Sequence, residues 1–160
     1  MKLDNSKTII SSRIKLFAVT VLFLAYIVMS YVAKLFKLTL FGWNDTVWTI
    51  IFAAIWVFIA FLPVILKHQY ISYSDDDELI VFRYFSSGIF GGRKNSVEIE
   101  KKTFAGYETK KQLIGLSLSI TLYQNFEKGI AKYPPIYISA LSKKERAKIF
   151  ISLNQYSPKS

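Results

Sequence analysis

The pattern of hydrophobic and polar positions divides the chain into two parts. The first part holds two long runs without a formal charge, residues 16–33 (18 residues) and 46–66 (21 residues). At about 1.5 Å per helical residue these runs cover roughly 27 Å and 31 Å, close to the ~30 Å hydrocarbon core of a bilayer. Core helices of soluble proteins rarely reach this length with no charge on any face, so the pattern predicts transmembrane helices over 16–34 and 46–66.

The segment between the two runs, residues 35–45, is predicted to be a short periplasmic hairpin. It carries Phe36, Phe41 and Trp43, and aromatic residues are enriched at the membrane–water interface. Asp45 stands at the predicted start of the second helix, where a carboxylate is favoured by the helix dipole. Two closely spaced antiparallel spans are therefore expected.

From Tyr70 onward the pattern changes to short alternating runs separated by polar turns, which is typical of β-strands. The clearest alternation predicts that four apolar residues share one buried face. These residues are Leu116, Leu118, Ile120 and Leu122. Strands are expected over residues 70–74, 79–85, 95–100, 103–110 and 116–124, with one or two more within 129–138.

A predicted helix over residues 142–156 closes the chain. Ser142 followed three residues later by Glu145 is a capping box, which marks a helix start. The expected fold class is therefore a membrane α+β protein. A cytoplasmic N-terminal segment (1–15) and a two-helix transmembrane hairpin precede a small antiparallel β-barrel or sandwich (67–160), which the C-terminal helix caps.

Charge and composition set the expected orientation. Hydrophobic residues make up 52% of the chain and charged residues 20%, with a net charge of +10. Lysine and arginine are denser in the N-terminal flank and after the second run than in the hairpin, so both termini are expected in the cytoplasm. The alternative interpretation makes the first run a signal peptide that is cleaved near residues 28–30.

Composition also excludes several function classes. The chain has no cysteine and a single histidine, His68, which excludes disulfide frameworks, thiolate metal sites and zinc sites built from histidines. No Asp, Glu, Lys, Arg or His lies inside the two runs, so the chain is not expected to form a transport pathway by itself. From Lys67 onward 15 basic residues oppose 9 acidic ones, a balance that suits an anionic membrane leaflet better than nucleic acid.

Four segments of the second part resemble a known family. They run from Arg83-Tyr84-Phe85 to Gly91-Gly92, over Thr103-Phe104-Ala105-Gly106-Tyr107-Glu108, over Lys132-Tyr133-Pro134-Pro135-Ile136, and over Ser139-Ala140-Leu141-Ser142. Residues 71–156 thus resemble the membrane-anchored bacterial pleckstrin-homology-like (PH-like) proteins common in Bacteroidota. The resemblance implies a seven-stranded barrel capped by a helix, a location in the bacterial inner membrane, and a binding or assembly role without catalysis.

One departure from the lipid-binding pleckstrin domains concerns the first hairpin. Those domains use a basic loop to hold inositol phosphates, whereas the corresponding turn here is Asp75-Asp76-Asp77-Glu78. Four carboxylates repel a phosphorylated headgroup, which argues against inositide recognition at that place. Calcium binding by this run is the other interpretation, but the alternating ligand spacing of an EF-hand loop is missing, so a solvated turn is preferred.

A second turn offers candidate contacts with the membrane surface. Ile89 and Phe90 stand beside Arg93 and Lys94, so the apolar pair could dip into the interface while the cations meet anionic headgroups. The glycines around them lack the spacing and the following helix of a phosphate-binding loop. A plain turn is the competing interpretation.

Small residues mark candidate positions for helix packing. Ala18 and Ala25 are seven residues apart in the first run, as are Ala53 and Ala60 in the second, so each pair lies on one helix face where a neighbouring helix could approach closely. Chance spacing of alanines is the competing interpretation.

These features predict a non-enzymatic inner-membrane module that serves as an interaction, scaffold or accessory subunit of a membrane protein assembly. The alternative is a peripheral sensor of anionic lipid that uses the basic loops. The expected partners are the lipid bilayer and a membrane protein or a second copy of the chain. No catalytic residue, metal, cofactor, nucleic acid or small-molecule substrate is expected.

Overall fold

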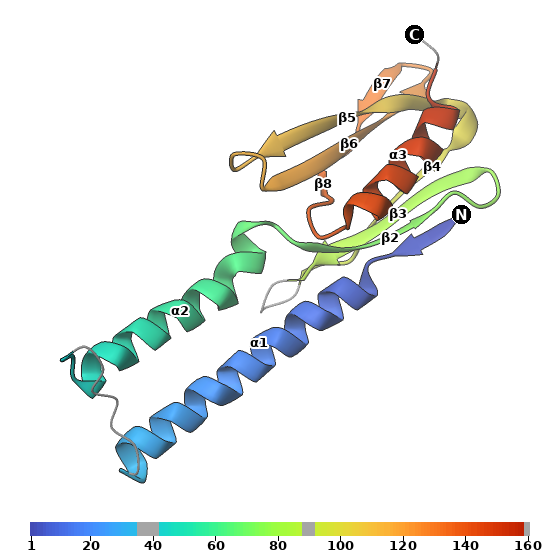
Figure 1. The fold of residues 1–160 in the computed structure, drawn as a ribbon. Helices are drawn as coiled ribbons and strands as arrows, with labels where there is room; N and C mark the ends of the chain where they lie inside the picture. The colour runs from blue at the N-terminus through green and yellow to red at the C-terminus, as the bar shows by residue number, and fades with distance from the viewer. Residues whose placement is uncertain (35–41, 88–91, 159–160) are drawn as a thin grey trace. The chain divides into compact units, whose positions relative to one another are not determined.

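The computed structural model describes residues 1–34, 42–87 and 92–158 of the 160-residue chain. It divides into two compact units (Figure 1). One is the helical unit, Ile10–Leu62, and the other is the β unit, which combines Met1–Ile9 with Pro63–Ser160. The chain therefore enters the β unit twice, once before the helical unit and once after it.

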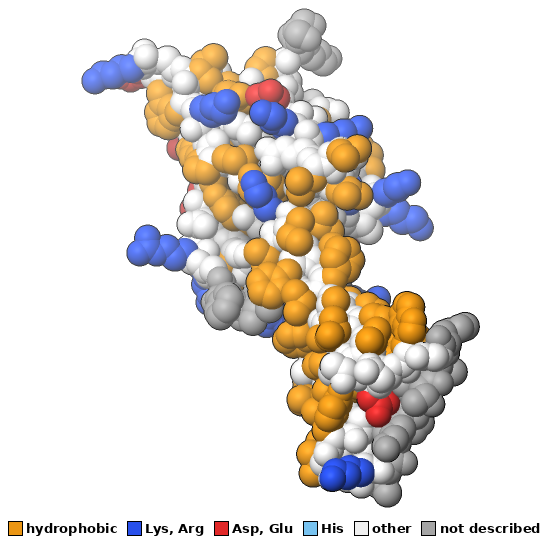
Figure 2. Space-filling view, turned by 90° about the vertical axis from the view of Figure 1, so that its left-hand side faces the viewer, with side chains coloured by type: hydrophobic (Ala, Val, Ile, Leu, Met, Phe, Trp, Pro, Cys, Tyr) orange, Lys and Arg blue, Asp and Glu red, His pale blue; other side chains and the backbone are white. Residues whose placement is uncertain are grey.

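Two long helices dominate the first half of the chain. Helix α1 covers Ser6–Ile27 and continues as the π-helical turn η1 over Val28–Val32, and α2 covers Asp45–Ile65. Both are long and apolar enough to cross a membrane, and only 6% of the most apolar window of each is buried. In Figure 2 hydrophobic side chains gather along the helices, and most of the visible Lys and Arg side chains lie over the β unit.

The helices coincide with the predicted spans, with one difference at the N-terminus. Helix α2 matches the prediction to within a residue, and Pro63 lies in its last turn. Helix α1 begins ten residues before the predicted span, because the polar positions between Ser6 and Lys15 continue the helix instead of forming a separate segment. The predicted hairpin at 35–45 lies mostly outside the described residues.

The β unit contains two antiparallel four-stranded sheets. The first has the order β1-β2-β3-β4, and the second has the order β5-β6-β7 with β8 also paired to β6. The strands are β1 (Lys2–Asp4), β2 (Gln69–Ser74), β3 (Leu79–Ser86), β4 (Asn95–Glu100), β5 (Phe104–Gln112), β6 (Ser117–Phe126), β7 (Gly129–Lys132) and β8 (Ile136–Tyr137). The 3-10 turn η2 (Lys101–Thr103) connects the sheets.

Seven of these strands confirm the sequence prediction to within two residues at most ends. The eighth, β1, was not predicted. It pairs antiparallel with β2, with Leu3 opposite Tyr73, and so extends the first sheet with residues that lie more than sixty positions away in the sequence.

The core lies between the sheets and the C-terminal helix α3 (Lys143–Tyr156). Side chains alternate along β2 and β3, so that Ile71, Tyr73, Ile80 and Phe82 are buried on one side. Helix α3 adds Ile149 and Leu153 to the same cluster. The predicted capping box is confirmed: the Ser142 hydroxyl accepts from Glu145 N, and the Glu145 carboxylate accepts from Ser142 N.

One prediction for the core is wrong. Ile120 and Leu122 are buried and Leu118 is partly buried, but Leu116 is 69% exposed. Strand β6 begins only at Ser117, so Leu116 belongs to the preceding turn and the alternation that governs the strand does not apply to it.

Candidate functional site

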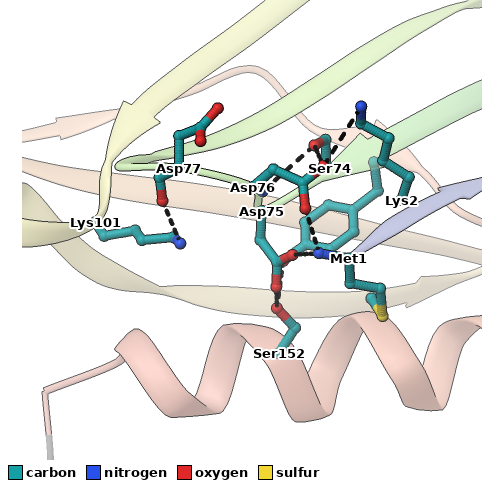
Figure 3. A network of polar contacts seen from close by, with 9 residues as sticks. Met1, Lys2, Ser74, Asp75, Asp76, Asp77, Lys101 and Ser152 are labelled. Atoms are coloured by element: carbon teal, nitrogen blue, oxygen red, sulfur yellow. Dashed lines mark hydrogen bonds and ion pairs between the residues drawn. The ribbon is translucent and has the colours of Figure 1, made fainter.

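A polar network surrounds the N-terminal amine where β1 meets the turn between β2 and β3 (Figure 3). The Met1 ammonium group donates to Asp75 Oδ1 and, over 2.7 Å, to Asp76 Oδ1. The backbone joins the two segments as well, because Asp75 N donates to Met1 O at 3.2 Å. The predicted acidic turn is therefore the partner of the chain's first residue.

The network continues from Asp75 into the core. Ser152, on α3, donates its hydroxyl to Asp75 Oδ2. Tyr73 Oη lies 2.6 Å from the same Ser152 oxygen, and since the single Ser152 proton is committed to Asp75, Tyr73 must donate. Three elements, β1, the β2–β3 turn and α3, are thereby joined through one buried carboxylate.

The hydrogen bonds shift the pKa values of the groups involved. Burial alone would raise the pKa of Asp75, but the bonds from the Met1 amine and Ser152 outweigh it, so the pKa lies below its usual 3.8. The hydrogen bond to Asp75, with a second to Asp76, raises the pKa of the Met1 amine above 8.0. At neutral pH the Met1 amine is therefore protonated and the Asp75 carboxylate is ionised, and the two groups form an ion pair.

This geometry suits a structural junction better than a reactive site. Both oxygens of the Asp75 carboxylate are occupied by groups of the protein itself. The next turn residue, Asp77, uses its backbone carbonyl to accept from Lys101 Nζ at 2.5 Å. Within the described ranges, no group of three His, Asp or Glu side chains is arranged to hold a metal ion.

A hollow of about 510 Å³ lies beside the junction, on the outer face of the first sheet. Its lining mixes cations and carboxylates, including Lys2, Arg83, Asp4, Asp76 and Asp77. Charges of both signs line the same surface, so the hollow presents neither an anion site nor a cation site.

A second polar contact joins Asn5, the residue before α1, to β2. The sequence analysis did not predict it. Asn5 is 1% exposed. Its Oδ1 accepts from Ile71 N at 2.9 Å, and its Nδ2 donates to Gln69 O at 2.9 Å. The amide side chain thus continues the pairing of β1 with β2 for one further step after the strand ends at Asp4. In a sequence, an asparagine just before a helix indicates an N-cap. The neighbouring residues do not show that its hydrogen-bond partners lie more than sixty positions later in the chain.

The candidate membrane-surface residues lie on the loop between β3 and β4. Arg93 and Lys94 are exposed, while Ile89 and Phe90 lie outside the described residues. Ser87, at the start of this loop, donates both its backbone N–H (3.0 Å) and its hydroxyl (2.8 Å) to His68 O. The β3–β4 loop therefore starts beside His68, three residues after the end of α2.

His68 itself is a half-buried residue, and desolvation lowers its pKa below 6.5. It is therefore neutral at pH 7 in this structure. A histidine that senses pH near neutrality needs a pKa close to 7, so the lowered pKa argues against such a role for His68.

The four candidate packing alanines are divided between exposed and covered positions. Ala18 and Ala25 of α1 are exposed, Ala53 of α2 is partly buried, and Ala60 is 1% exposed. Several contacts between α1 and α2 are made by larger side chains. Trp56 Nε1 donates to Thr20 Oγ1 at 2.9 Å, Tyr26 packs edge-on against Phe52 at 5.0 Å, and Phe23 stacks on Trp56. Packing of Ala18 and Ala25 against a further helix stays a prediction.

Comparison with protein-family models, curated proteins and solved structures finds no match to this chain. The resemblance to PH-like proteins therefore stays a prediction, and the function has to be argued from the geometry.

Proposed function

We propose that the chain is a non-enzymatic module, anchored in the bacterial inner membrane by α1 and α2, whose PH-like β unit serves in the cytoplasm as an interaction, scaffold or accessory subunit. The partner would be a membrane protein assembly or a second copy of the chain. The pairing of β1 with β2 is the observation that carries this proposal.

That pairing constrains the topology of any membrane insertion. Residues before α1 and residues after α2 build one sheet, which supports a topology with both on the same side of the membrane. Two spans meet this condition and one span does not. Cleavage of the first run as a signal peptide would also remove β1, Asn5 and the Met1 ammonium group from the β unit, which favours an uncleaved anchor.

Two further features support a binding module rather than an enzyme. The strands after α2 followed by α3 have the order that the family resemblance implies, seven strands and one helix. The buried carboxylate of Asp75, which accepts one hydrogen bond on each oxygen, is used to join structural elements. Both features agree with a binding function, which depends on the surface of the β unit and needs no reactive side chain.

Co-purification from the native membrane tests the proposal. The full chain, tagged and extracted in mild detergent, is expected to retain a membrane protein or a second copy in a fixed ratio. Replacing Ala18 and Ala25 by Leu fills the small-residue face of α1 and is expected to abolish retention. Leu24→Phe, an exposed position on an adjacent face, is the matched control. Recovery of the wild-type chain alone contradicts the proposal.

The second candidate function, a sensor of anionic lipid, is favoured by the contact of Ser87 with His68. This contact keeps the Arg93–Lys94 loop near the end of α2. Anionic phospholipid retained by the purified chain, measured by native mass spectrometry, should decrease in Arg93→Gln/Lys94→Gln. It should not decrease in Lys143→Gln/Lys144→Gln, which changes exposed lysines of α3. Equal retention in both variants rejects the sensor.

A further inference from the structure

The turn between β5 and β6 has an unusual backbone for its residues. Gly115 N donates to Gln112 O at 3.1 Å, which closes a four-residue turn. Its central residues, Leu113 and Ile114, have φ of +50° and +55°. The loop between the paired residues Gln112 and Ser117 thus has three consecutive residues with positive φ, because Gly115 follows with φ of +85°, and such positions are normally filled by Gly, Asn or Asp. A β-branched residue such as Ile114 is rarely found in this region.

The same turn presents large apolar side chains to solvent. Leu113 is 47% exposed, Leu116 is 69% exposed, and Ile114 is fully exposed. An exposed apolar side chain contributes nothing to the core, and the left-handed backbone adds strain. Apolar residues in a strained turn are expected where another apolar medium covers them.

Contacts within the β unit place this turn at the end of α2. Ser117, the first residue of β6, has its hydroxyl 3.5 Å from Leu66 O. Lys67 Nζ donates to Tyr137 Oη at 2.9 Å, and Tyr137 pairs with Ser119 of β6. The start of β6 therefore lies beside the residues at which the predicted second span ends.

The charged residues are distributed as expected for a surface that faces an anionic leaflet. The residues around the end of α2 and the start of β6, over 63–71, 84–87, 92–95 and 110–120, contain no Asp or Glu. Five basic residues occupy them near the turn or the chain exit: Lys67, Arg93, Lys94, Lys110 and Lys111. The acidic residues lie elsewhere, above all in the β2–β3 turn at the opposite end of β2. Basic side chains beside an apolar tip match the interface of a bilayer with anionic lipid.

We propose that the β5–β6 turn inserts Leu113, Ile114 and Leu116 into the interface of the bilayer that holds α2, and that Lys110 and Lys111 meet its anionic headgroups. The proposal rests on the membrane anchoring proposed above. The turn then serves as a third contact with the membrane, in addition to the two points where the chain enters and leaves it. Such a contact fixes the orientation of the β unit on the surface.

The cysteine-free chain permits a direct test with three matched positions. Ile50 of α2, Ile114 and Ile130 of β7 are all strongly exposed isoleucines, and Ile130 lies at the end of the second sheet opposite to the turn. Each is replaced by Cys in the full chain, labelled with an environment-sensitive fluorophore, and placed in phosphatidylglycerol–phosphatidylethanolamine nanodiscs. Spin-labelled acyl chains then quench only those probes that contact lipid.

The Ile114→Cys probe is expected to shift to the blue and to be quenched to an extent closer to the Ile50→Cys probe than to Ile130→Cys. Quenching of Ile50→Cys without Ile114→Cys overturns the insertion and leaves the anchoring intact. No quenching of Ile50→Cys overturns the anchoring as well. A blue-shifted Ile114→Cys probe that lipid does not quench indicates a protein cover and also overturns the proposal.

The lysine contacts are tested by exchanging phosphatidylglycerol for phosphatidylcholine. Quenching of the Ile114→Cys probe is expected to decrease, whereas that of Ile50→Cys is expected to stay constant. Unchanged quenching of Ile114→Cys overturns the contribution of Lys110 and Lys111.

Discussion

At the scale of single residues, two polar side chains hold the beginning of the chain in the β unit. Asn5 supplies the hydrogen bonds that a further strand residue would have made to Ile71 and Gln69. Asp75 receives the Met1 ammonium group and the Ser152 hydroxyl. Both side chains are buried, and a buried polar group is costly when its partner is removed. These residues should therefore be sensitive to small changes.

Replacing Asn5 by Ala is expected to lower the free energy of unfolding by roughly 1–3 kcal/mol, because the buried Ile71 N–H loses its acceptor. Thermal unfolding of the full chain in detergent, followed by circular dichroism, measures the change. The control is Asn125→Ala, at an exposed position in the β6–β7 hairpin. Equal melting of Asn5→Ala and the wild type contradicts the role assigned to this side chain.

Replacing Asp75 by Asn is expected to lower the free energy of unfolding by roughly 1–3 kcal/mol at pH 7. The folded-state pKa of Asp75 is lowered, so its stabilisation is present above 3.8 and disappears as the pH falls through the lowered value. The pKa of the Met1 amine is raised, so its contribution is present below 8.0 and disappears as the pH rises through the raised value.

Chemical denaturation of wild type and Asp75→Asn at acidic, neutral and alkaline pH tests this dependence. The difference between the two proteins should be largest at neutral pH and shrink at both extremes. Asp77→Asn is the matched control, since the contact of Asp77 with Lys101 uses its backbone carbonyl. A difference that is constant with pH, or an equal loss in Asp77→Asn, rejects the ion pair as the cause.

At the scale of elements, local patterns predicted most of the structure. The alternation of apolar and polar residues predicted strands β2 to β6, because consecutive side chains of a strand point to opposite faces. The capping box predicted the start of α3. Strand β1 escaped prediction because it has three residues with a single apolar one, Leu3, and its partner β2 follows more than sixty residues later. No local signal reports a pairing of that range.

The candidate sites were harder to predict for the same reason. The acidic run at Asp75 was expected to be a solvated turn, but its partner is the amine of Met1, which lies far away in sequence. Leu116 continues the apolar alternation of β6 and was therefore assigned to that strand, but it lies in the four-residue loop between the paired residues Gln112 and Ser117. Where local chemistry and backbone conformation disagree, as at Leu113 and Ile114, sequence reasoning fails.

The turn also yields a prediction about stability. A left-handed backbone costs an ordinary residue about 1–2 kcal/mol, so Leu113→Asn/Ile114→Gly is expected to raise the free energy of unfolding in detergent by about that amount. Denaturant unfolding measures the gain, and Leu113→Asn alone is expected to give part of it. A loss of stability in the double variant would show that the two side chains support the fold.

At the scale of the whole molecule, the pairing of β1 with β2 joins the segment before α1 to the segment after α2. The chain starts in the β unit, passes through α1 and α2, and returns to the same sheet. The proposed function and the proposed insertion of the β5–β6 turn both depend on this arrangement, because each requires a β unit held at one surface of the membrane.

Cysteine accessibility in spheroplasts tests this arrangement most directly. Single cysteines at Lys2, Trp43 and Lys128 mark the first strand, the segment before α2 and the β6–β7 turn. A membrane-impermeant maleimide is expected to label Trp43→Cys in intact spheroplasts, and to label Lys2→Cys and Lys128→Cys only after permeabilisation. Labelling that places Lys2 and Lys128 on opposite sides, or Trp43 on the same side as both, contradicts the account.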